Sequence, residues 1–141
     1  MTEAAGYSAT PLPRKLGIGP GDTVALIGAP EWLEDELAAV PGVTELHTDL
    51  DGAELFDVIV VFVSRRAELE AELGRLHDRM APACGLWVAW PKRSSGVPTD
   101  MTDNVVREIV LPTGLVDNKV CAIDETWSGL RLVIRRENRP G

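Results

Sequence analysis

The chain has few residues of the kinds that build metal, redox or membrane sites. Its 141 residues include two cysteines and two histidines, and neither Cys84 nor Cys121 belongs to a Cys-x-x-Cys pair or has a histidine or aspartate at ligand spacing. This spacing predicts two reduced, buried thiols and no metal. The longest apolar run, Val58 to Val63, is too short to cross a bilayer, and no basic segment precedes an apolar one at the N-terminus. We therefore expect a cytoplasmic protein.

Positive charge is also scarce. Acidic residues outnumber basic ones by 22 to 14, and the formal net charge of −8 argues against binding to nucleic acid or to an anionic membrane. The cluster of Arg131, Arg135, Arg136 and Arg139 is a local exception. At strand spacing these side chains point to both faces, so we expect a solvated edge.

Strand and helix patterns alternate along the chain. Short apolar runs predict buried strands at 23–28, 43–47, 56–63 and 86–90, and apolar residues at helical spacing fall between several of them. Ser64 is a candidate cap for one helix, and Thr99 or Thr102 for another. The polar link between the last two strands, 119–123 and 130–135, is too short for a crossover and predicts an antiparallel hairpin.

These elements predict an α/β fold with three layers. The sheet would be doubly wound, mostly parallel and six-stranded, with an antiparallel C-terminal hairpin. We expect one domain over residues 16–136, a flexible N-terminal arm over 1–15 and a tail over 137–141.

A polar loop follows the strand at 86–90. Because Pro91 has no N–H to donate, the strand must end there, at the edge where open α/β sheets bind ligands. Two cations, two hydroxyls and a glycine before a helix suit a phosphate or a carboxylate. These residues are Lys92, Arg93, Ser94, Ser95 and Gly96. An ordinary solvated loop is the simpler alternative.

A second polar segment should lie at the same edge. It consists of Asp124, Glu125, Thr126 and Trp127. The two acids could contribute to a ligand site or could pair with Lys92 and Arg93 as a rim that closes the sheet. Near that rim, Trp90 and Trp127 could form the floor of a ligand pocket or fill a groove of a partner.

The order of elements resembles the Rossmann-like fold of class I S-adenosylmethionine-dependent methyltransferases. Leu16-Gly-Ile-Gly-Pro-Gly-Asp-Thr-Val-Ala-Leu-Ile-Gly28 is similar to that family's first strand and its approach. Leu55-Phe-Asp-Val-Ile-Val-Val61 resembles its central strand, and Met80-Ala-Pro-Ala-Cys-Gly-Leu-Trp-Val88 the strand after it. One strand of the family's sheet is missing between His47 and Phe56.

The chain departs from this family at the cofactor loop. The family has a glycine-rich loop after its first strand, whereas this chain has Gly28-Ala29-Pro30. Of the cofactor residues that the resemblance implies, Gly28 and an acid, Asp49 or Asp51, are retained. We therefore predict a non-catalytic ligand- or partner-binding regulatory module without a cofactor, leaning against an enzyme. The alternative is an S-adenosylmethionine-dependent methyltransferase with an atypical cofactor loop.

Three further segments resemble a bacterial, largely actinobacterial, domain family to which no activity can be traced. They are Gly6-Tyr-Ser-x-Thr-Pro-Leu12, Trp90-Pro-Lys-x-Ser-Ser-Gly96 and Asp124-Glu-Thr-Trp-Ser-Gly-Leu130. The expected partner is a small anionic ligand or another protein. A structural subunit whose segment from Gly6 to Arg14 orders on another chain is a third possibility.

Overall fold

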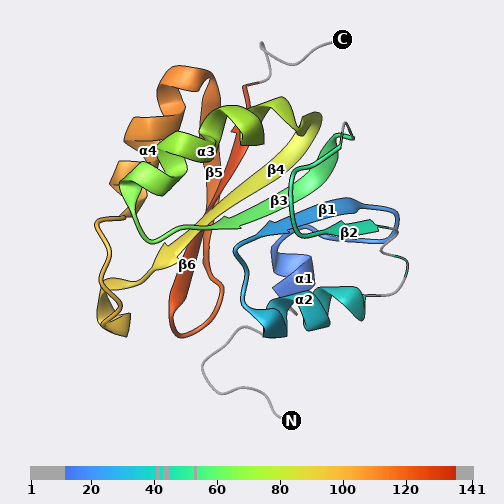
Figure 1. The fold of residues 1–141 in the computed structure, drawn as a ribbon, viewed down its shortest axis with the longest axis horizontal. Coiled ribbons are helices and arrows are strands. Elements are labelled where there is room, and N and C mark those ends of the chain that lie inside the picture. The colour runs from blue at the N-terminus through green and yellow to red at the C-terminus, as the bar shows by residue number, and fades with distance from the viewer. Residues whose placement is uncertain (1–11, 41, 43–44, 53, 136–141) are drawn as a thin grey trace.

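The computed structural model describes residues 12–40, 42, 45–52 and 54–135. They form one six-stranded sheet in the order β2-β1-β3-β4-β6-β5 (Figure 1). The strands are β1 (Thr23–Ile27), β2 (Glu45–His47), β3 (Phe56–Phe62), β4 (Met80–Pro91), β5 (Leu115–Ala122) and β6 (Trp127–Ile134). The helices are α1 (Leu12–Lys15), α2 (Glu31–Ala38), α3 (Arg66–Asp78) and α4 (Asp103–Val110), with the 3-10 turns η1 (Arg93–Ser95) and η2 (Leu111–Thr113).

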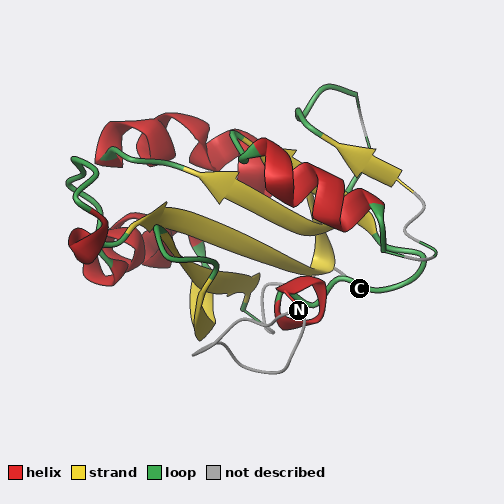
Figure 2. Cartoon of the chain, turned by 90° about the horizontal axis from the view of Figure 1, so that it is seen from below, coloured by secondary structure: helices red, strands yellow, loops and turns green. Residues whose placement is uncertain are grey.

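The predicted fold class is confirmed. Strands β2, β1, β3 and β4 are mutually parallel, and β6 pairs antiparallel with both β4 and β5. The sheet twists from one edge to the other, as the view in Figure 2 shows. β2 is an edge strand, so no further strand lies outside it in the described part of the chain.

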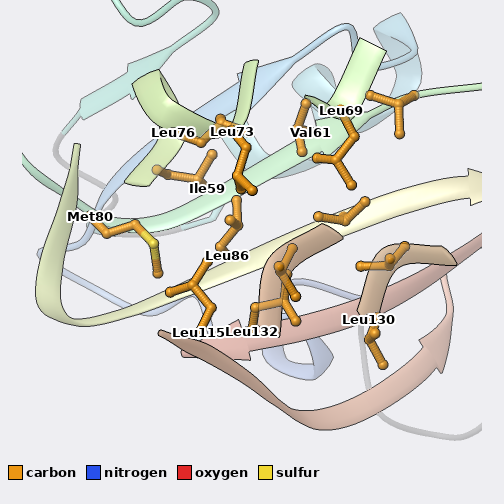
Figure 3. Close-up of a cluster of buried hydrophobic side chains, with 14 of the residues drawn as sticks. Ile59, Val61, Leu69, Leu73, Leu76, Met80, Leu86, Leu115, Leu130 and Leu132 are labelled. Carbon is orange, nitrogen blue, oxygen red and sulfur yellow. The ribbon is translucent and has the colours of Figure 1, made fainter. Parts of the chain in front are cut away.

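Helices cover both faces of the sheet. On one face, Leu69, Leu73 and Leu76 of α3 pack against sheet residues that include Ile59, Val61 and Leu86 (Figure 3). On the other face, Leu33 and Leu37 of α2 pack against Val24, Leu26, Val60 and Trp87. Successive residues of β3 from Val58 onward therefore enter opposite cores, which is why the strand is apolar at every position except exposed Asp57.

β4 is longer than the sequence pattern predicts, because it begins at Met80 instead of Leu86. Its register against β3 shifts between the pairs Phe56↔Met80 and Val58↔Gly85, and its pairing with β6 begins at Leu86. Pro82 therefore lies in an irregular stretch that has no neighbour on the β6 side, where its missing N–H breaks no ladder. The turn of the hairpin is also shorter than expected, since β5 ends at Ala122 and β6 begins at Trp127.

The structure describes the last four residues of the expected N-terminal arm. Residues 1–11 lie outside the described residues, as do the expected tail and two of the four clustered arginines, but Leu12–Lys15 form α1. Leu12 packs against the α2-side core, and the buried indole Nε1 of Trp87 donates to the carbonyl oxygen of Leu16 at 2.9 Å. These two contacts attach the start of the described chain to the sheet. None of the described helices has the length and apolarity needed to span a membrane.

Candidate functional site

A pocket of about 550 Å³ opens where β4 ends, between the loop after that strand and the start of α4. Its lining includes the predicted residues Trp90, Lys92, Arg93 and Gly96. Trp90 and Met101 are buried beneath it, with 7% and 3% of their surfaces exposed. We call this space the Trp90 pocket. It places an apolar floor beside two cations at the carboxyl edge of the sheet.

Hydrogen bonds within the loop fix the backbone that carries the two cations. The Ser95 hydroxyl donates to the carbonyl oxygen of Lys92 at 2.7 Å and accepts from the N–H of Val97 at 3.1 Å. The N–H of Lys92 donates to the carbonyl oxygen of Thr126 at 2.7 Å, which joins this loop to the β5–β6 turn. The hydroxyl of Ser95 therefore serves the loop itself, and exposed Ser94 is not among the residues that line the pocket.

The charges around the Trp90 pocket are unevenly neutralised. Asp100 accepts from the N–H of Arg66 at 2.7 Å, and Asp103 pairs with Arg107 at 3.1 Å. Within the described residues, neither Lys92 nor Arg93 has a carboxylate oxygen within 4.0 Å. Asp103 is therefore ion-paired, whereas Asp100 keeps its negative charge beside two cations that have no ion pair in the described chain. This imbalance favours an anion.

The second predicted segment builds the turn and not the pocket wall. One oxygen of Asp124 accepts from the N–H groups of Thr126 and Trp127, at 2.8 and 2.7 Å. Trp127 packs edge-on against Phe62, with ring centroids 5.0 Å apart, and Glu125 is exposed. Of this hairpin the pocket uses Ser128 instead. An ion-paired rim is absent from the described residues.

Sequence reasoning missed the residues that complete the pocket. Thr99 donates to the carbonyl oxygen of Ser64 at 2.6 Å and accepts from the N–H of Met101 at 3.0 Å. It thereby fixes the segment between η1 and α4 against the loop after β3. The Thr and Asp residues at 99–103, where α4 starts, predict a helix start and were the signal that could have extended the site to this segment.

Gly28 ends β1 in a conformation that favours glycine. Its φ is +70°, and a Cβ there would lie 3.2 Å from the carbonyl oxygen of Phe62. Ala29 then packs against the α2-side core, and Pro30 is the N-cap of α2 without a side-chain cap hydrogen bond. The loop therefore has one glycine turn at the expected position, followed at once by the helix.

Asp49 and Asp51 lie beyond the end of β2. The last paired residues of β1 and β2 are Ala25 and His47, so Gly28 and Asp49 both follow the paired segment at the same edge of the sheet. Both acids are exposed, and a carboxylate oxygen of Asp49 accepts from the N–H of Asp51 at 3.0 Å. Asp49 therefore shapes this turn, and the second aspartate has no hydrogen bond through its carboxylate within the described chain.

Glu45, His47 and Glu54 form a group with metal-ligand chemistry away from the Trp90 pocket. One ligand atom from each lies within 4.8 Å of the others. Unlike Lys92 and Arg93, His47 has carboxylate neighbours. Its Nε2 is 3.3 Å from Glu45 Oε2 and 3.9 Å from Glu54 Oε2. The side chains are 24–50% exposed. We interpret the group as a surface pairing of an imidazole with carboxylates.

Several solved structures that share this fold are methyltransferases. The chain is similar to the N-methyltransferase NodS from Bradyrhizobium japonicum WM9, with a TM-score of 0.61 and 18% identity over 89% of this chain and 93% of that one. Magnesium protoporphyrin IX methyltransferase (ChlM) from Synechocystis PCC 6803, with bound SAH, has a TM-score of 0.57 and 12% identity, over 82% of this chain and 74% of that one. A ribosomal protein L11 methylase from Lactobacillus delbrueckii subsp. bulgaricus has a TM-score of 0.56 and 13% identity, over 89% of this chain and 75% of that one.

These likenesses establish a methyltransferase-like fold. No protein-family model matches the chain, and no curated protein matches its sequence. The likeness to an actinobacterial domain family therefore stays a prediction.

The prediction of a domain without a cofactor is wrong. The structures that match include ChlM with bound SAH and with bound SAM, and a SAM-dependent methyltransferase from Aquifex aeolicus, so proteins with this fold do bind that cofactor. The error came from counting glycines in the loop after β1. A tight turn at the end of that strand needs positive φ at one position, and Gly28 supplies it.

Proposed function

We propose that the chain is an S-adenosylmethionine-dependent methyltransferase with an atypical cofactor loop. The observation that carries the proposal is Gly28, whose left-handed conformation closes β1 against the Phe62 carbonyl within a methyltransferase-like sheet. Asp49 or Asp51 would hold a ribose hydroxyl at the same edge. The cofactor would supply an electrophilic methyl group, and the chain would position an acceptor beside it.

The Trp90 pocket is the proposed acceptor site. Its volume falls within the range of small-molecule sites, roughly 300–1,000 Å³. Buried Trp90 and Met101 suit an apolar body, and the unpaired Lys92 and Arg93 suit a carboxylate or phosphate on it. We propose a small apolar acceptor that bears such an anionic group. Gly96 lines this pocket as well. The remaining predicted ligand residues would support the loops and would not contact the acceptor. They are Ser94, Ser95, Asp124, Glu125, Thr126 and Trp127.

A binding module that retains the adenosyl ligand without catalysis is the second candidate. The observation that favours it is Pro30, which has no N–H at the start of α2 and makes no side-chain cap. The loop after Gly28 therefore offers fewer backbone donors to a ligand than a glycine-rich loop would. A regulatory protein that responds to the concentration of the cofactor would need to bind the cofactor but would not need an acceptor site.

Calorimetry and thermal unfolding with S-adenosylhomocysteine test the cofactor site. A ligand at about one hundred times its dissociation constant stabilises by roughly 2.7 kcal/mol, which raises the melting temperature of a domain this size by about 5–10 °C. Asp49→Ala or Asp51→Ala should remove most of this shift. Asp35→Ala, an exposed acid on α2, is the matched control and should leave it intact. No shift in the unaltered protein would contradict both candidates.

Methyl transfer from labelled S-adenosylmethionine then separates the two candidates. The acceptors are a panel of small aromatic carboxylates and phosphate esters. Lys92→Ala with Arg93→Ala should lower acceptor use and leave the affinity for S-adenosylhomocysteine unchanged. Binding of the cofactor without transfer to any acceptor would favour the module.

We also propose a cytoplasmic location. Cys84 and Cys121 are both free thiols in the structure, which fits a reducing compartment.

A further inference from the structure

A second, smaller pocket lies on the other side of the sheet and is surrounded by cations. Its volume is about 240 Å³, and it lies between the end of α1 and strands β5 and β6. We call it the basic pocket. Its lining is Arg14, Lys15, Gly17, Asn118, Lys119 and Arg131. It shares no residue with the Trp90 pocket.

The four cations of the basic pocket lack carboxylate partners. Acids outnumber bases in this chain by 22 to 14, and all acids except Glu3 and Glu137 lie in the described part. Even so, within that part no carboxylate oxygen comes within 4.0 Å of the nitrogens of any of the four. By contrast, Arg66, Arg75 and Arg107 are each ion-paired. Four cations without an ion pair in the described chain therefore gather at this pocket of an acidic protein.

Neutral oxygens hold these side chains in place without neutralising them. Lys15 Nζ donates to the carbonyl oxygen of Ala122 at 3.3 Å, and Lys119 Nζ donates to that of Lys15 at 3.2 Å. Arg131 Nη1 donates to Asn118 Oδ1 at 3.3 Å. Three of the four cations are thus positioned by polar contacts but keep their full charge, and most of their N–H donors remain available.

Gly85 makes room for one of these cations. It is buried within β4, and its φ is not positive, so its backbone conformation does not require glycine. A Cβ there would lie 2.5 Å from Nε and 2.8 Å from Nη2 of Arg131. Any larger residue would therefore displace the guanidinium. A glycine inside a strand often marks such a close approach, and here it lets the Arg131 side chain lie against the neighbouring strand.

We propose that the basic pocket binds a phosphate or diphosphate group. Its volume is below the range of sites that enclose a whole small molecule, so it fits the charged group of a ligand and leaves the rest outside. Arg131 offers a planar fork of donors to phosphate oxygens, and Lys15, Lys119 and Arg14 add charge around it. The inference does not depend on the proposed methyltransferase activity, because the residues belong to a different pocket.

Titration calorimetry with inorganic pyrophosphate at low ionic strength tests the proposal. Loss of a charge-assisted contact weakens binding by about tenfold or more, so Arg14→Ala with Lys119→Ala should reduce affinity by at least that factor. Arg75→Ala with Arg135→Ala removes two exposed cations that line neither pocket and should change affinity less than about twofold. Arg131→Lys keeps the charge but removes the fork and should give an intermediate loss. Circular dichroism checks that each variant is folded.

Two results would overturn the proposal. One is the absence of pyrophosphate binding to the unaltered protein, and the other is equal loss in both double variants. A fluorescent single-stranded DNA of about twelve nucleotides distinguishes the source of the phosphate. Binding of this DNA that pyrophosphate displaces would assign the pocket to a nucleic-acid backbone, whereas pyrophosphate binding without DNA binding would assign it to a small phosphorylated ligand. DNA binding that pyrophosphate does not displace would count against the pocket.

Discussion

Gly28 and Gly74 differ in what a methyl group would meet. Gly28 has φ +70° and faces the Phe62 carbonyl oxygen, whereas Gly74 lies within α3, where a Cβ would have nothing within 4 Å. The first position needs glycine for both its backbone and its surroundings. Position 74 does not need glycine, and glycine inside a helix carries a conformational entropy cost.

We expect the same substitution to have opposite effects at these two positions. Gly28→Ala should lower the free energy of unfolding by about 1–2 kcal/mol, since alanine is strained at positive φ. Gly74→Ala should raise it by roughly 0.5–1 kcal/mol. Urea unfolding of the two variants measures both values. Equal stability of Gly28→Ala and the unaltered chain would show that the β1 turn adapts to a side chain.

Of the predicted helix caps at Thr102 and Ser64, the structure contains the first but not the second. Thr102 caps α4 as the sequence predicts, because its hydroxyl oxygen accepts from the N–H of Val105 at 3.1 Å. The expected cap at Ser64 does not form. Instead α3 begins after Arg65, and Glu68 Oε1 accepts from the N–H groups of Ser64 and Arg65, at 2.7 and 3.1 Å.

Removing these two hydroxyls should therefore have unequal consequences. Thr102→Ala leaves the N–H of Val105 without its partner and should cost about 1 kcal/mol of stability, whereas Thr102→Ser should retain most of it. Ser64→Ala removes a hydroxyl with no capping role and should stay within about 0.5 kcal/mol of the unaltered chain. Chemical denaturation of the three variants provides the comparison. A larger loss at Ser64 than at Thr102 would contradict this assignment of caps.

Element types were predictable from the sequence, but several boundaries and half of the site were not. The apolar run of β3 and the helical spacing of Leu69, Leu73 and Leu76 identify buried elements directly. The early start of β4 depends on a bulge opposite β3, which no local pattern encodes. The pocket-forming role of Thr99 depends on a bond to Ser64, 35 residues away. Asp124 was misplaced because its preference for turns outweighs any use of its charge.

For the molecule as a whole, the buried thiol of Cys84 links stability to pH. Burial, and secondarily the negative charge of Asp57, raises the pKa of Cys84 from 9.0 to about 12. Burial also raises the pKa of half-buried Cys121, where nearby Lys15 and Lys119 oppose the shift. Below pH 9 both states keep the thiol proton, so its contribution to stability is complete. Above that pH the unfolded state loses the proton first, and stability falls until the folded pKa is reached.

We expect the free energy of unfolding to decline between about pH 9 and pH 12, with Cys84 contributing up to about 1.4 kcal/mol per pH unit. Urea unfolding at pH 8, 9.5 and 10.5 measures the slope. Cys84→Ala should make the slope shallower without abolishing it, because Cys121 remains. Identical slopes for the two proteins would show that the Cys84 thiol does not set this dependence.

The position of β6 between β4 and β5 has a consequence for synthesis. Of the six strands, β6 leaves the ribosome last, yet it pairs with two strands that are already made. Until Trp127–Ile134 emerge, one edge of β4 has no partner and β5 is not attached to the sheet. The nascent chain therefore exposes an open strand edge from the synthesis of β4 until that of β6. The sheet is completed only by its final strand, so we infer that it cannot close before Trp127–Ile134 have been made.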